Sequence, residues 1–110
     1  MTDMEYYCAR AVERAHAGIT YLDTVAEIPD WAERLEKPVN MASTKACVLA
    51  QLFGRFRDGA RALMLNDDVT VALGFRGTTA ELQSMREFHR YYEVLSATWE
   101  TERRRRLGIS

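Results

Sequence analysis

The stretch that decides the fold is TTAELQSMREFHRYYEVLSATWETERRRR, residues 78–106. Large apolar side chains recur in it at steps of three and four residues, the spacing of one helix face. These side chains are Met85, Phe88, Tyr92, Leu95 and Trp99. Thr78 is followed three residues later by Glu81, which matches the capping box that starts many helices. The pattern predicts one helix over 79–106, about 42 Å long at 1.5 Å per residue.

A second long apolar stripe lies at the start of the chain, over residues 3–26. Its members follow the same three- and four-residue spacing. They are Cys8, Val12, Ala15, Ile19, Leu22 and Ala26. Gly18 lies inside this segment and costs about 1 kcal/mol relative to alanine, but the stripe continues past it. The two longest stripes therefore predict two long helices that pack side by side.

Shorter helices are predicted between the two long ones. Their ranges are 29–35, 43–53 and 57–65. The second contains TKACVLAQLF (44–53), which is apolar nearly all round and therefore fits a buried central helix. Residues 66–75 fit either a strand or a short helix capped by Asn66 or Asp67, and we favour the helix because a lone strand has no partner. The chain is thus expected to be an all-α bundle, one domain over 1–110.

Composition excludes several classes of protein. Of the 110 residues, 47% are hydrophobic and 28% are charged, which is a globular balance. The net charge of −1 gives no overall attraction to nucleic acid. No apolar run approaches the roughly 18 residues of a membrane span. The two scattered cysteines, Cys8 and Cys47, and the absence of a signal-peptide pattern favour the cytoplasm.

Charge is unevenly distributed along the chain. Residues 1–40 carry eight acidic and four basic side chains, whereas residues 41–77 carry five basic and three acidic ones. The C-terminal segment holds a run of four arginines: Arg103, Arg104, Arg105 and Arg106. Such a run can complement a helix dipole, at roughly 0.3–1 kcal/mol per charge, or contact phosphates or an acidic protein surface. It covers about one turn and points in all directions, which favours the structural interpretation.

Residues that could carry catalysis or hold a metal are sparse. His16 and His89 belong to no spacing typical of zinc ligands. Cys47 lies in an apolar stretch, and Lys45 projects from another helix face, so the thiol is expected to be a small buried apolar group. Phosphate-binding glycine motifs are absent. We therefore expect no enzyme activity, no metal and no cofactor.

Residues 43–65 also permit a DNA-binding interpretation. Two short predicted helices meet around Gly54, near the dimensions of a helix-turn-helix. Arg57 and Arg61 could reach phosphates, but RDGARALML (57–65) is poor in side chains that read bases. Nucleic acid is therefore a less favoured partner than protein.

Three short motifs carry a resemblance to a family. They are CVLAQLFGRF (47–56), ALGF (72–75) and LSATWETERRRR (95–106). In these the chain resembles small uncharacterised proteins of actinobacteria and actinobacteriophages that share C-V-L-G-Q-L-F-G, then L-G-F, then a final helix bearing tryptophan. Ala50 stands where that pattern has its first glycine. The resemblance implies a phage or prophage origin, with action in the host cytoplasm, and no activity.

The leading functional hypothesis is a small protein-interaction module, encoded by a phage or prophage and acting on a host protein. Its main rival is a DNA-binding regulator that uses residues 43–65 and the arginine run. An unbroken 42 Å helix exceeds a domain with a radius of gyration of roughly 13 Å, so the helix bends near His89, overhangs the domain or packs against a second copy. We predict the last of these, a homodimer, with Tyr91 on an exposed flank. The expected dimer interface comprises Phe88, Tyr91, Tyr92, Leu95 and Trp99.

Overall fold

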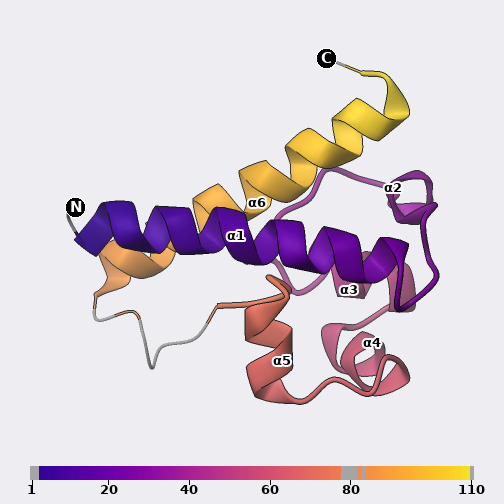
Figure 1. Cartoon of the computed structure of the whole chain (residues 1–110), viewed down its shortest axis with the longest axis horizontal. Helices are drawn as coiled ribbons and strands as arrows, with labels where there is room; N and C mark the ends of the chain where they lie inside the picture. Colours follow the sequence, from indigo (N-terminus) through magenta and orange to yellow (C-terminus); the bar gives the residue numbers. More distant parts are fainter. Residues whose placement is uncertain (1–2, 78–81, 83, 110) are drawn as a thin grey trace.

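A computed structural model describes residues 3–77, 82 and 84–109. Over these residues the chain is all-helical, without strands, which confirms the predicted class (Figure 1). The helices are α1 (Asp3–Asp23), α2 (Trp31–Arg34), α3 (Val48–Phe53), α4 (Phe56–Ala62), α5 (Asp67–Ala72) and α6 (Met85–Leu107). None of the helices in this part of the chain has the length and apolar character that crossing a bilayer requires.

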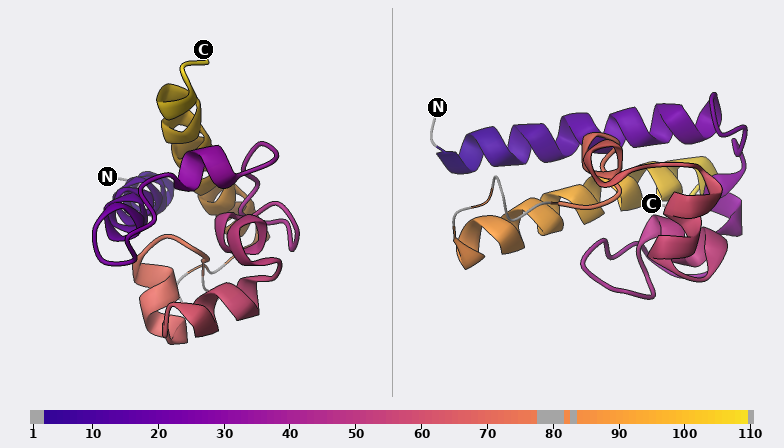
Figure 2. Two further views of the ribbon diagram at one scale, coloured as in Figure 1. Left: turned by 90° about the vertical axis from the view of Figure 1, so that its right-hand side faces the viewer. Right: turned by 90° about the horizontal axis from the view of Figure 1, so that it is seen from below.

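The two long helices, α1 and α6, pack side by side and run in the same direction, as two views show (Figures 1 and 2). Gly18 lies where α1 meets both α6 and the end of α5. A Cβ atom at Gly18 would lie 2.0 Å from the carbonyl oxygen of Leu73 and 2.7 Å from Cζ2 of Trp99. Gly18 lowers the intrinsic stability of α1, but its lack of a side chain permits α1, α6 and the end of α5 to approach closely.

The last helix is shorter than the sequence predicts. It begins at Met85, because Ser84 is its N-cap: the Ser84 hydroxyl accepts from the Glu87 amide and donates to the Glu87 carboxylate. The capping box predicted at Thr78 and Glu81 lies outside the described residues. At 23 residues the helix is about 34 Å long, within the 36 Å longest extent of the molecule. The prediction of an over-long helix is wrong.

The buried face of α6 also differs from the predicted stripe. It comprises Tyr91, Leu95, Trp99 and Arg103, at steps of four. Met85, the first member of the predicted stripe, is 67% exposed. Tyr91 is only 1% exposed, and its hydroxyl accepts a hydrogen bond from Arg14 of α1. The prediction that Tyr91 lies on an exposed flank is therefore wrong.

The short helices agree with the expected order but differ at their ends. The helix expected at 43–53 begins only at Val48. Before it, the Ser43 hydroxyl accepts hydrogen bonds from the backbone amides of Lys45 and Ala46, and these bonds stabilise a turn in place of the first helical residues. The helix expected at 57–65 ends at Ala62, since Met64 adopts left-handed geometry with φ of 58°. The favoured short helix at 66–75 is confirmed, with the Asn66 side chain as its cap.

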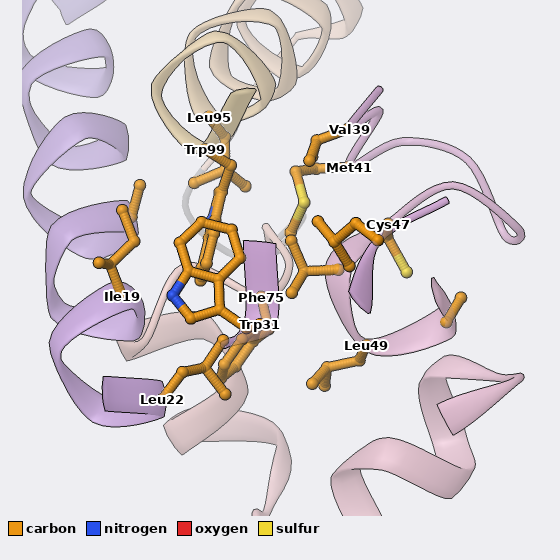
Figure 3. Close-up of a cluster of buried hydrophobic side chains, with 14 of the residues drawn as sticks. Ile19, Leu22, Trp31, Val39, Met41, Cys47, Leu49, Phe75, Leu95 and Trp99 are labelled. Atoms are coloured by element: carbon orange, nitrogen blue, oxygen red, sulfur yellow. The ribbon is translucent and has the colours of Figure 1, made fainter. Parts of the chain in front are cut away.

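The core is centred on two tryptophans from opposite ends of the chain (Figure 3). The rings of Trp31 and Trp99 meet edge to face at 5.3 Å, and Phe75 stacks on Trp99 at 5.6 Å. The Trp99 indole N–H donates to the carbonyl of Gly74. Leu49 of α3 is fully buried in the same cluster. This core fixes the loops around α3, α4 and α5 against the helix pair.

Candidate functional site

Each arginine of the C-terminal run contacts a carboxylate on its own helix. Arg103 and Arg104 lie 3.0 and 3.9 Å from Glu100. Glu102 receives hydrogen bonds from the other two arginines, Arg105 and Arg106. Glu100–Arg104 and Glu102–Arg106 are thus ion pairs between residues four apart on one helix.

Arg106 also joins the ends of three helices. It makes a bidentate contact with Asp23 at the end of α1, with both N–O distances 2.6 Å. Its guanidinium lies 5.1 Å from the ring centroid of Trp31, which begins α2. Hydrogen bonds from Arg105 and Arg106 lower the pKa of Glu102 from its ordinary 4.5 to about 2. These contacts support the structural interpretation of the run.

The residues predicted for a dimer interface differ in their burial within the chain. Tyr91, Leu95 and Trp99 are buried within the chain. Phe88 and Tyr92 are partly buried, and their rings contact each other at 4.8 Å. The three buried side chains cannot meet a second copy in this structure. The homodimer itself stays a prediction.

A different surface gathers positive charge into a concavity. We call it the basic groove; it has a volume of about 690 Å³. It lies between the turn before α3, the α3–α4 junction, the segment after α5 and one side chain of α6. Four cations line it, the groove cations Lys45, Arg55, Arg57 and Arg76. Among the described residues no acidic side chain belongs to this lining.

Polar contacts hold the turn that carries Lys45. The Ser96 hydroxyl of α6 accepts from the Met41 amide at 2.8 Å. Asn40 closes the turn, because its amide donates to the Ala46 carbonyl at 3.1 Å. This wall of the groove is therefore anchored to the last helix.

The opposite wall begins where α3 ends. Gly54 takes a φ of 93°, and Arg55 follows in extended geometry with φ of −142°. This sharp change of direction brings Arg55 and Arg57 to the groove. Both are exposed, and neither they nor Lys45 form an ion pair with a described residue. Three of the four groove cations are thus not occupied by a carboxylate of the described residues and can pair with an anionic ligand.

Arg76, the fourth groove cation, is held in place but weakly paired. Its guanidinium lies 5.9 Å from the Phe56 ring centroid, and its Nε donates to the Gly77 carbonyl. The Gly77 amide in turn donates to the Tyr92 hydroxyl at 2.7 Å. Asp67 approaches the guanidinium at 3.6 Å, but its side chain is 94% exposed. An exposed pair of this kind contributes only about 0–1 kcal/mol, so an incoming anion can replace it.

The floor of the groove is apolar. Met41, Cys47 and Phe75 contribute to it, and all three are buried. Burial raises the pKa of the Cys47 thiol above its ordinary value, which keeps the thiol protonated and confirms it as a buried apolar group. Over the described residues no group of three side chains is arranged to hold a metal ion. The groove is suited to binding anions.

The sequence contains a signal for this site in the basic residues of 41–77. The excess of basic residues over 41–77 includes all four groove cations. They are dispersed in the sequence, whereas the arginine run is contiguous and therefore more conspicuous. In the folded chain the dispersed groove cations converge on one surface, whereas the contiguous arginines of 103–106 pair with carboxylates.

Comparisons with known proteins give no family for this chain. No family model matches it, and neither the curated proteins nor the solved structures include a significant match. The groove is therefore the feature of this chain that bears on its function.

Proposed function

We propose that this chain is a small protein-interaction module that binds its partner through the basic groove, as a phage- or prophage-encoded modulator of a host protein. The observation that carries the proposal is the convergence on one concavity of Lys45, Arg55 and Arg57, which form no ion pair with any residue that the structure describes. Charge of one sign in a cleft attracts an oppositely charged partner and speeds its association. The phage origin rests on the sequence resemblance alone.

A pull-down from an actinobacterial lysate tests the proposal. The bait is the wild-type chain, a groove variant (Lys45→Gln, Arg55→Gln, Arg57→Gln) or a control variant. The control carries Lys37→Gln, Arg61→Gln and Arg86→Gln. Its cations lie outside the groove, are exposed and form no ion pair with a described residue, and both variants have the same net charge.

The proposal expects a host protein that the wild type and the control variant retain and the groove variant loses. Equal retention by both variants would place the contact surface elsewhere. Recovery of DNA fragments without a protein would favour the rival function.

That rival is a DNA-binding regulator, and one feature of α4 favours it. Arg57 and Arg61 are both exposed on this helix. However, α4 has seven residues, about 10 Å, and exposed Asp58 lies between the two arginines. A labelled DNA duplex at about 50 mM salt tests this function directly, because phosphate contacts are strongest at low salt. Absence of binding there would eliminate it.

A further inference from the structure

We propose that the occupant of the basic groove is an acidic peptide segment that places carboxylates on the groove cations and an apolar side chain on the groove's aromatic wall. This inference rests on the proposed function and gives the chemistry of the partner. Protein surfaces and nucleic acids both present anions. Three features of the groove favour the peptide.

The first feature is size. Pockets that hold drug-sized ligands have volumes of roughly 300–1,000 Å³, and the groove has about 690 Å³. A few residues of extended peptide fit such a volume. A DNA duplex is too wide to enter it and could contact only the rim.

The second feature is the mixture of charge and apolar surface. Phe56 and Tyr92 line the groove beside the groove cations and are partly exposed. Arg76 lies over the Phe56 ring, so a cation and an aromatic face are presented together. A peptide that alternates carboxylates with an aromatic or long aliphatic side chain matches both. A phosphate backbone alone leaves the rings uncovered.

The third feature is the modest amount of positive charge. The whole chain has a net charge of −1, and its first forty residues are acidic. Affinity for a polyanion grows with the number of phosphates neutralised, commonly 6–10 in DNA-binding proteins. Four groove cations in an acidic protein suit a short ligand with a few carboxylates.

Fluorescence anisotropy with labelled peptides tests the inference. The probe is the peptide EDFEDL, and the controls are EDSEDS, which has the same charge without apolar side chains, and KRFKRL, which has the opposite charge. We expect EDFEDL to bind and to weaken as salt rises, EDSEDS to bind several-fold more weakly, and KRFKRL not to bind. The groove variant should lose about ten-fold in affinity, and the control variant of equal charge less than two-fold.

A variant that strengthens binding gives a second and independent result. Asp67→Asn removes the carboxylate that occupies Arg76, so we expect roughly two-fold tighter binding. Asp68→Asn is the matched control, because Asp68 is exposed in the same first turn of α5 and has no ion pair with Arg76. A gain with Asp67→Asn alone supports direct contact between Arg76 and the peptide. Equal effects of the two variants would contradict it.

Three outcomes would overturn the inference. EDSEDS binding as tightly as EDFEDL would show that the aromatic wall is unused. Tighter binding of a short labelled oligothymidine than of EDFEDL, with the same loss in the groove variant, would make the ligand a single-stranded nucleic acid. If neither probe binds while the pull-down still gives a groove-dependent host protein, the proposed function survives and the peptide inference fails.

Discussion

Replacing Arg106 by glutamine tests whether the arginine run stabilises the fold. The side chain makes two 2.6 Å contacts with Asp23 and lies over the Trp31 ring. The substitution removes the positive charge but keeps a polar side chain. The matched control is Arg105→Gln, the same change one residue earlier, at a side chain that is 69% exposed and pairs only with Glu102 in the contacts described.

The expected loss of stability follows from burial. Exposed ion pairs contribute about 0–1 kcal/mol, whereas removing one partner of a fully buried pair costs about 3–5 kcal/mol. The Arg106 and Asp23 side chains are 23% and 27% exposed, between these limits. The lost contact with Trp31 adds about 0.5–1 kcal/mol. We expect a decrease in the free energy of unfolding of about 2–3 kcal/mol for Arg106→Gln and a much smaller decrease for the exposed Arg105→Gln.

Urea unfolding followed by tryptophan fluorescence measures both values, because Trp31 and Trp99 are fully buried and both report on the core. A double-mutant cycle with Asp23→Asn should give a coupling energy of about 1–2 kcal/mol. Equal losses in Arg106→Gln and Arg105→Gln, or no coupling to Asp23, would refute the structural interpretation of the run.

Three further predictions concern the same framework. Gly18→Ala, which helix propensity alone would make stabilising by about 1 kcal/mol, should lower the unfolding free energy by about 1–3 kcal/mol, because its Cβ would meet the Leu73 carbonyl; a higher melting temperature would contradict the packing. The lowered pKa of Glu102 gives a stability contribution that is complete above pH 4.5 and lost as the pH falls toward 2. When the free energy of unfolding is measured against pH, the Glu102→Gln variant should therefore lose less stability than the wild type between pH 4.5 and 2; equal losses in the two proteins would contradict this contribution. Ser84→Ala should cost about 1 kcal/mol as a lost N-cap, measured by thermal unfolding against Thr101→Ala, which removes an exposed hydroxyl within α6 that has no hydrogen bond to a described residue; an unchanged melting temperature would mean that Ser84 does not cap α6.

Periodicity predicted the helical class and the pairing of the two long helices, because apolar stripes on long segments indicate helix faces directly. It failed at helix ends, where single side chains decide. Ser43 and Ser84 form local hydrogen bonds that stop or start a helix, and several nearby residues could have done so in the sequence. The buried face of α6 contains Tyr91 in place of the adjacent Tyr92 of the predicted stripe, and the Tyr91 hydroxyl accepts a hydrogen bond from Arg14, a distant contact that periodicity does not encode.

The candidate site could be predicted much less well than the fold. Arg103 to Arg106 form the most conspicuous charge pattern, yet their carboxylate partners include Asp23, which is distant in the sequence. The groove cations come from three separate segments that only the tertiary fold brings together. Convergence of this kind depends on how loops pack against the core, and local patterns do not encode it.

The central claim is that the chain binds its partner through the basic groove, and NMR titration tests it most directly. The labelled chain is titrated with the EDFEDL peptide while the backbone amide signals are recorded. The account predicts that the largest shifts fall in 41–47, 54–57 and 75–77, with little change at 103–106. Shifts concentrated at 103–106, or spread over the exposed face of α1 with none at the groove, would contradict it.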